Sequence, residues 1–92
     1  MVTIYGKDAC PWCDRARELC EQYNIPYDYK SVDDRFEGPA YLLELKHLAQ
    51  ESGLTFKTVP QIWWNNKYIG GFDQLAEAVE NNNVGNFGQG SF

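Results

Sequence analysis

The stretch VTIYGKDACPWC, residues 2–13, decides how the rest of this chain is interpreted. Its first part, VTIY at residues 2–5, is β-branched and aromatic, which is typical of a short strand. After a short loop, CPWC at residues 10–13 opens a helical pattern. Pro11 suits the first turn of a helix because its missing N–H is not needed there. The sequence therefore predicts a Cys-x-x-Cys pair at the junction of a strand and a helix.

The two cysteines of this pair have complementary positions. Cys10 is expected near the N-terminus of the helix, where unpaired backbone N–H groups and the positive end of the dipole favour an anion. Such a position favours the thiolate, which is the nucleophile of thiol–disulfide exchange. Cys13 follows one turn further along, close enough to attack a mixed disulfide formed at Cys10. The pair could therefore close a small disulfide ring and reopen it.

A zinc site is the structural alternative for such a pair. It usually needs a second pair of Cys or His ligands at matching spacing. Beyond the pair, the chain offers only Cys20 and the single His47. Cys20 is expected on the inner side of the same helix as a small buried apolar residue, and His47 at the surface or its boundary. A redox pair in a β-α-β pattern is therefore favoured, and we expect no metal.

Size and composition are those of one globular domain. The chain has 92 residues, 43% of them hydrophobic, which is enough for one modest core. Its net charge of −5 argues against nucleic acid or an anionic membrane as the main partner. No stretch approaches the ~20 apolar residues of a membrane span, and no export signal is visible. We therefore expect a reducing cytoplasm, where a Cys-x-x-Cys pair is more often catalytic than structural.

The remaining patterns predict the element order β-α-β-α-β-β-α. The expected elements are strands at residues 2–5, 26–30, 61–64 and 67–69, and helices at 11–23, 39–52 and from 72 to 81 or 82. The first two strands should be parallel. The last two should be antiparallel, because Asn65-Asn66 tolerates the positive φ of a tight hairpin turn. Residues 83–92, rich in Asn and Gly, are expected to form a flexible tail after a domain of residues 1–82.

Three separated motifs resemble those of the glutaredoxin family. They are CPWC at residues 10–13, Thr58-Val59-Pro60 before the third strand, and Gly70-Gly71-Phe72-Asp73 at the last helix. The resemblance covers residues 1 to about 81. It implies a thioredoxin fold, which is an α/β fold with a four-stranded mixed sheet and three helices. The length between the first helix and residue 59, together with GGFDQL at 70–75, is most similar to the small glutaredoxins of tailed phages.

The resemblance also implies roles for individual residues. Cys10 would be the nucleophile and Cys13 the resolving thiol. Pro60 would follow a cis peptide bond beside the thiols. Val59 would pair its backbone with the cysteine of glutathione in the manner of an antiparallel strand. Trp12, which replaces the Tyr most common in the family, would wall the groove.

The two ends of glutathione would be held by separate groups. Lys7 and Lys57 would pair with the glycyl carboxylate. The turn at residues 71–73 would hold the γ-glutamyl end, with backbone N–H groups for its carboxylate and Asp73 for its ammonium. Each of these residues also has a plain structural alternative as a solvated lysine, a turn or a helix cap. The complete implied set is Lys7, Trp12, Lys57, Thr58, Val59, Pro60, Gly71, Phe72 and Asp73.

The activity that the resemblance implies is glutathione-dependent thiol–disulfide exchange. The protein would reduce protein disulfides by a dithiol route and glutathione mixed disulfides by a monothiol route. Glutathione would be the reductant, and a glutathione or thioredoxin reductase could recharge the system. Ribonucleotide reductase is the client that the phage-like resemblance implies. We expect a monomer in the cytoplasm, or in the host cytoplasm if the chain is viral.

Three other functions stay open at this point. The nearest is a thioredoxin-like disulfide reductase, recharged by a reductase and binding glutathione weakly. From another class comes an iron–sulfur carrier or zinc module; Pro11 argues against the former, because proline after the first cysteine disfavours a bridging cluster in this family. A redox-inert interaction module is disfavoured because both thiols are kept.

Overall fold

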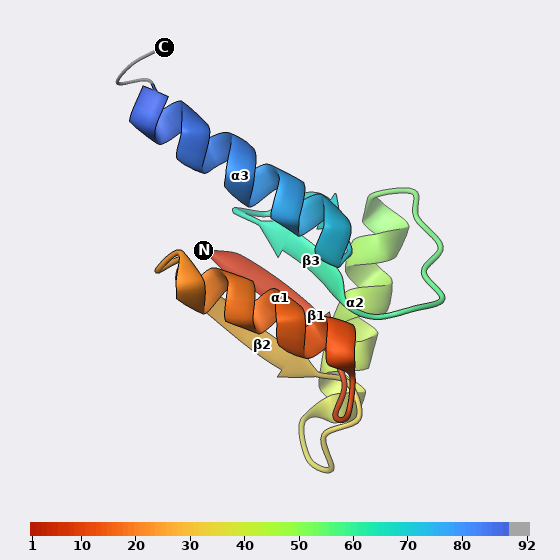
Figure 1. Cartoon of the computed structure of the whole chain (residues 1–92). Coiled ribbons are helices and arrows are strands. Elements are labelled where there is room, and N and C mark those ends of the chain that lie inside the picture. Colours follow the sequence, from red (N-terminus) through yellow and green to blue (C-terminus); the bar gives the residue numbers. More distant parts are fainter. Residues whose placement is uncertain (89–92) are drawn as a thin grey trace.

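The computed structural model describes residues 1–88, in which four strands form one mixed sheet with helices on both faces (Figure 1). The elements in chain order are β1 (Val2–Gly6), α1 (Pro11–Gln22), β2 (Tyr27–Ser31), α2 (Gly38–Glu51), β3 (Gln61–Trp64), β4 (Lys67–Gly70) and α3 (Phe72–Gly88). This order and this sheet confirm the predicted thioredoxin fold.

The sheet has the strand order β2-β1-β3-β4, so β1 is an inner strand. It runs parallel to β2 and antiparallel to β3, and β3 is antiparallel to β4. The turn between β3 and β4 is formed by Asn65 and Asn66, whose φ angles are 53° and 68°. Both lie in the left-handed region, as the predicted tight hairpin requires. Because β1 lies inside the sheet, the loop that follows it is supported on both sides.

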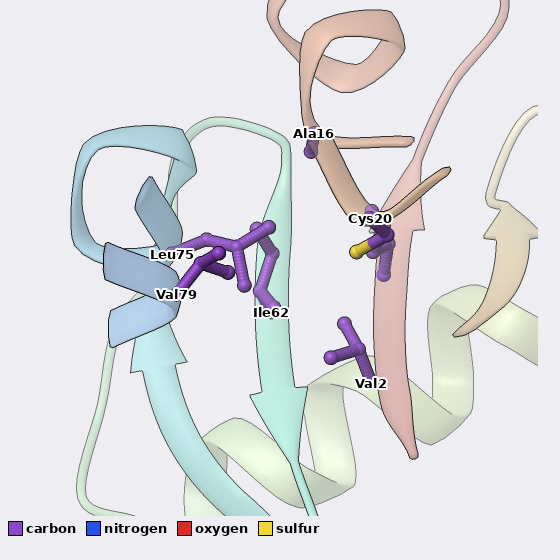
Figure 2. Packing of buried hydrophobic residues seen from close by; sticks show 7 residues of the cluster. Val2, Ala16, Cys20, Ile62, Leu75 and Val79 are labelled. Atoms are coloured by element: carbon purple, nitrogen blue, oxygen red, sulfur yellow. The ribbon is translucent and has the colours of Figure 1, made fainter. Parts of the chain in front are cut away.

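Side chains alternate between two cores along β1. Val2 and Ile4 are fully buried on the face covered by α1 and α3, while Tyr5 is buried on the opposite face under α2. This is the alternation expected of a strand buried on both faces. Figure 2 shows the first cluster, where side chains of α1, α3 and the sheet meet. Its fully or almost fully buried members are Val2, Ile4, Ala16, Cys20, Ile62, Leu75 and Val79.

Cys20 belongs to this core, as predicted. Its side chain is fully buried, and Figure 2 shows its sulfur directed into the cluster. Burial raises the pKa of the Cys20 thiol to about 11, because a thiolate there would lose its hydration. His47 also lies where it was expected, exposed on α2 with Nε2 3.4 Å from a carboxylate oxygen of Glu51.

The thiol of the third cysteine, Cys20, should therefore be unreactive in the folded, oxidised protein. With the Cys10–Cys13 disulfide intact, we expect no fast-reacting thiol toward Ellman's reagent at pH 8, since only about one Cys20 in a thousand would be ionised. Guanidinium unfolding should release the Cys20 thiol, which is the remaining free cysteine. A stoichiometric fast reaction before unfolding would show that Cys20 is accessible.

The end of the last helix differs from the prediction. It was expected at Asn81 or Asn82, but α3 continues to Gly88. The Asn- and Gly-rich residues have low helix propensity, yet each residue added to an existing helix costs far less than starting a new one. Residues 89–92 of the predicted tail lie outside the described residues. The flexibility of the tail and the domain boundary at residue 82 stay predictions.

Candidate active site

The loop between β1 and α1 brings the cysteine pair to one end of the sheet. Ala9 has a φ of 51°, a left-handed conformation that turns the chain onto α1. The loop is held from β2, where the Tyr29 hydroxyl donates to the backbone carbonyl of Lys7 at 2.9 Å. Gly6 is required beneath this contact, because a Cβ there would lie 2.4 Å from the Tyr29 hydroxyl oxygen. Cys10 therefore has a firmly supported position.

Cys10 and Cys13 form a disulfide at the start of α1, with their Cα atoms 5.2 Å apart. Cys10 is the N-cap residue, and its sulfur accepts a hydrogen bond from the Cys13 N–H at 3.3 Å. Its carbonyl accepts from the Asp14 N–H at 3.0 Å, and Pro11 occupies the first helical turn as predicted. Cys10 is 6% exposed and Cys13 is 0% exposed. Cys10 is therefore the more exposed residue of the pair.

A groove of about 340 Å³ lies between α1, the segment before β3 and the start of α3. This volume is at the lower end of the usual range for small-molecule sites. Its lining consists of Trp12, Thr58, Val59, Pro60, Gly71, Phe72, Asp73 and Gln74. Every predicted groove residue is present except Lys7 and Lys57. The Val59–Pro60 peptide bond is cis, as the family resemblance implied.

Two aromatic rings form one wall of this groove. The rings of Trp12 and Phe72 have their centroids 5.6 Å apart at 43°, so α1 and α3 contact each other above the groove. Trp12 remains 51% exposed, and the Arg15 guanidinium lies over its ring at 4.8 Å. A cation over an aromatic face is favourable. The Arg15 guanidinium therefore places a positive charge beside the groove. Asp73 is the charged residue in the lining of the groove itself.

The start of α3 supplies hydrogen-bond donors to the same groove. The Gly71 N–H donates to Gln74 Oε1 at 2.9 Å, and the Leu75 N–H returns to the Gly71 carbonyl at 3.0 Å. Gln74 thus caps the helix from its third position. The sequence interpretation missed Gln74 as a groove residue, although a Gln three residues after the cap was a usable signal. The N–H groups of the first turn beyond Gly71 have no partner within the helix.

The two glycines before α3, Gly70 and Gly71, differ in what a side chain would meet. Gly70 has a φ of 126°, and an added Cβ would lie 2.9 Å from Gln74 Cγ. The backbone alone therefore excludes a larger residue at this position. An added Cβ at Gly71 would meet its nearest neighbours at ordinary contact distances of 3.6 and 3.7 Å. At Gly71, therefore, the protein itself has room for a side chain, and glycine keeps the groove floor open.

The two lysines predicted for the groove are placed outside its lining. Lys7 is exposed on the loop after β1, and Lys57 is exposed on the segment before β3. Both belong to segments that also carry site residues, Cys10 in the first case and Pro60 in the second. Neither side chain lines the groove, so the predicted contact of Lys7 and Lys57 with a bound molecule stays a prediction.

A second hollow, of about 290 Å³, lies on the sheet face covered by α2. Glu44 accepts hydrogen bonds there from the Tyr5 hydroxyl and from Lys30 Nζ, so its charge is already paired. The hydrogen bond from Lys30, followed by the one from Tyr5, holds the pKa of the Glu44 carboxyl below its usual value. The pKa of Tyr5 is raised, mainly by burial and next by its hydrogen bond to Glu44. The two charged residues that line this hollow, Lys30 and Glu44, are paired with each other. The groove beside the thiols therefore remains the candidate site.

Residues 1–88 contain neither a metal-binding cluster nor a membrane-spanning helix. No group of three or more His, Cys, Asp and Glu side chains is placed there to hold a metal ion. None of the helices in this part of the chain combines the length and the apolar character that crossing a membrane requires. The chemistry that the described residues do support is that of the Cys10–Cys13 pair and its groove.

Comparison with known proteins agrees with this geometry. The family model described as Glutaredoxin matches residues 2–69. Glutaredoxin 1 of Escherichia coli (strain K12) is 37% identical over 84 residues, covering 88% of this chain and 94% of the relative. The relatives named here are cellular proteins, so the similarity to phage glutaredoxins stays a prediction.

Solved structures give the same result. The structure of glutaredoxin 1 from Francisella tularensis, complexed with cacodylate, has a TM-score of 0.68 and 31% identity, covering 88% of this chain and 93% of that one. A buckwheat glutaredoxin–glutathione complex also has a TM-score of 0.68, with 27% identity, covering 88% of this chain and 69% of that one. Family model, relatives and fold agree with a cysteine pair at the start of α1, and the chain belongs to the glutaredoxin family of thiol–disulfide oxidoreductases.

Proposed function

We propose that this oxidoreductase depends on glutathione and reduces both protein disulfides and mixed disulfides of glutathione. The observation that carries the proposal is the groove beside Cys10, which joins an aromatic wall to the N-terminus of α3. A tripeptide with a thiol in its centre fits such a groove if its cysteine faces Cys10. The buckwheat relative, whose structure is a glutathione complex, supports the same reading.

Cys10 is proposed as the nucleophile and Cys13 as the resolving thiol. Cys10 is the more exposed of the two, and the Cys13 N–H already points at its sulfur. After reduction this N–H and the helix dipole would stabilise a Cys10 thiolate. Cys13, fully buried one turn later, would be reached only by a sulfur bonded to Cys10. The difference in burial supports the roles that the positions of the two cysteines along the helix predicted.

The groove residues are proposed to hold glutathione along its length. The backbone of Val59 would pair with the cysteinyl residue as an added antiparallel strand, beside Thr58 and Pro60. Trp12 and Phe72 would cover its apolar side. The free N–H groups at the start of α3 would bind the γ-glutamyl carboxylate, and Asp73 would pair with its ammonium. Lys7 and Lys57, which are exposed on the segments that carry Cys10 and Pro60, would pair with the glycyl carboxylate.

Two routes follow from this arrangement, each a two-electron exchange. In the dithiol route the Cys10 thiolate attacks one sulfur of a protein disulfide, and the other sulfur leaves as a thiolate. Cys13 then attacks Cys10, releasing the second protein thiol and forming the disulfide seen in the structure. Two glutathione molecules reduce that disulfide and become glutathione disulfide. In the monothiol route the Cys10 thiolate attacks the glutathione sulfur of a mixed disulfide, and the other sulfur leaves as a thiolate. A second glutathione then attacks the glutathione sulfur bound to Cys10, which releases the Cys10 thiolate and glutathione disulfide.

The setting of this activity is also proposed. Glutathione disulfide would be recycled by glutathione reductase. Ribonucleotide reductase is the proposed protein client, because it is reduced by dithiol exchange and because the phage-like motifs suggested it. The protein would act as a monomer in the cytoplasm, or in the host cytoplasm if it is viral.

The decisive experiment compares wild type with Cys13→Ser. We expect Cys13→Ser to keep most of its activity on the mixed disulfide of glutathione and 2-mercaptoethanol, because that route uses Cys10 alone. It should lose at least about tenfold on a protein disulfide, because no thiol resolves the Cys10 adduct. Both rates are measured by NADPH consumption with glutathione and glutathione reductase present.

Two other outcomes would contradict the proposal. Equal loss on both substrates would contradict the two-route mechanism. Inactivity of both proteins on the glutathione mixed disulfide, with reductase-driven reduction of a protein disulfide intact in wild type, would indicate the thioredoxin-like alternative. In that case the roles given to Lys7 and Asp73 would be removed.

A further inference from the structure

An exposed apolar patch lies at the start of α2, and neither the thiols nor the groove uses it. Phe36 is 83% exposed and Leu43 is 70% exposed, the two largest values among the exposed large hydrophobic side chains. Pro39 and Ala40 between them are exposed as well. Ala40 and Leu43 are three residues apart on α2, and Phe36 precedes them in the turn that the Gly38 N–H closes onto the Asp34 carbonyl. These four residues, Phe36, Pro39, Ala40 and Leu43, are called the Phe36 patch below.

The turn that carries Phe36 is rigidly built. The Asp34 carboxylate accepts the Phe36 N–H at 3.0 Å and the Glu37 N–H at 2.7 Å. The Gly38 N–H donates to the Asp34 carbonyl at 3.0 Å. Gly38 is buried against the preceding loop, where an added Cβ would lie 2.6 Å from the Val32 carbonyl oxygen. Phe36 is therefore presented on a backbone that loses little freedom when a partner binds.

The same turn is bonded to the loop that carries the thiols. The Asp33 carboxylate accepts the Asp8 N–H at 3.0 Å and the Ser31 hydroxyl at 2.7 Å. The hydrogen bond from Ser31, followed by the one from the Asp8 N–H, holds the pKa of the Asp33 carboxyl below its usual value. The Asp33 carboxylate is therefore charged at neutral pH, and its hydrogen bond to the Asp8 N–H is charge-assisted. The Val32 N–H also donates to the Gly6 carbonyl at 2.8 Å. Figure 1 shows the two loops together at the lower end of the molecule.

Chain geometry limits how far the patch can lie from the reacting sulfur. Phe36 is three Cα steps from Asp33, at most about 11 Å, and Asp8 is two steps from Cys10, at most about 8 Å. A standard protein–protein interface of about 800 Å² per partner is roughly 30 Å across. An interface of this width, centred between Cys10 and Phe36, therefore covers both the thiol loop and the Phe36 patch.

Small substrates are directed to the other side of the thiols. In the sheet, β1 leads to Cys10 and has β2 and β3 as its two neighbours. The Phe36 patch follows β2, whereas the groove is built from Pro60 before β3 and from the start of α3. An extended tripeptide is only about 10 Å long. The groove is lined from α1, the segment before β3 and the start of α3, and the Phe36 patch, which follows β2, is not part of its lining.

We propose that the Phe36 patch is the docking surface for the protein substrates of this enzyme, with Phe36 inserted into an apolar pocket next to the client disulfide. This inference rests on the proposed reduction of protein disulfides and adds how such clients are recognised. An aromatic side chain on a rigid backbone is the usual form of an interface anchor. Glutathione binds in the groove, whereas a protein substrate also contacts the Phe36 patch, and this contact distinguishes a protein disulfide from a small one.

The test separates the two kinds of substrate in one set of variants. Phe36→Ser should lower kcat/KM at least about tenfold for the oxidised large subunit of a bacterial ribonucleotide reductase, mainly through KM. The same variant should match wild type on the mixed disulfide of glutathione and 2-mercaptoethanol. Phe36→Leu, which keeps an apolar anchor, should recover most of the lost activity. Folding should be unaffected, because the side chain is almost fully exposed, and a melting curve checks this.

A matched control lies on the same helix. Glu51→Ser changes an exposed residue at the far end of α2, about 20 Å from its start, and should alter neither activity. Equal activity of Phe36→Ser and wild type on the reductase, or equal loss on both substrates, would overturn the docking proposal. So would a wild type active on the small disulfide alone. Inactivity of wild type on both substrates would instead remove the proposed glutathione-dependent function.

Discussion

A Cys10→Ser variant is expected to lose thiol–disulfide exchange on small and protein substrates alike, by at least about a thousandfold. Serine keeps the shape of the side chain but offers a hydroxyl, which is neither ionised near neutral pH nor able to form a disulfide. Cys13 cannot replace it, because its side chain is 0% exposed in the structure. The measurement is the rate of NADPH consumption with glutathione, glutathione reductase and the mixed disulfide of glutathione and 2-mercaptoethanol.

The control for this variant is Cys20→Ala, which also removes one sulfur but in the core. It should keep wild-type activity, because Cys20 lies among apolar side chains of the cluster in Figure 2 and touches no substrate. Substantial activity in Cys10→Ser would contradict the assignment and would place the nucleophile on Cys13. Loss of activity in folded Cys20→Ala would give the third cysteine a redox role.

Leu75→Ala is expected to have the largest effect on stability, lowering the free energy of unfolding by about 2–5 kcal/mol. Leu75 is fully buried where α3 packs on the sheet, beside Ile62 and Val79 in Figure 2. Removing its branched end leaves a cavity that the rigid sheet cannot close. For a domain of this size the midpoint of thermal unfolding should fall by roughly 8–40 °C. Guanidinium unfolding followed by tryptophan fluorescence gives the free energy.

Leu43→Ala is the matched control, because it makes the same truncation at a side chain that is 70% exposed. We expect a change within about 0.5 kcal/mol. A similar loss in both variants would mean that the loss in Leu75→Ala does not come from its burial, since alanine is the better helix former and an exposed leucine leaves no cavity. The wild-type stability itself is expected in the usual range of about 5–15 kcal/mol.

Much of the fold could be predicted from local patterns. The helical pattern after CPWC predicted Cys20 on the inner side of α1, and Cys20 is indeed fully buried. The pair Asn65-Asn66 predicted the β3–β4 hairpin, and both residues have positive φ. The end of α3 was wrong because a helix that is already formed can continue through residues of low propensity.

The site was predicted in part, and the missing part has a physical reason. The groove residues came from motifs of neighbouring residues, so Trp12, Pro60 and Phe72 were expected together and the structure places them around one groove. Gln74 was missed because its bond to the Gly71 N–H follows from the capping geometry of α3. The distance of a long side chain such as Lys7 from the groove depends on loop geometry that spacing does not give.

The sequence by itself determined the order of the elements, the position of the cysteine pair at the start of α1 and the family to which the motifs point. These depend on interactions within about four residues, such as helix periodicity, turns and caps. Only the tertiary structure decided that Cys10 is the more accessible sulfur and that Phe36 shares the thiol end of the sheet. Both depend on which distant segments pack together, because burial is a sum over contacts that no short stretch of sequence contains.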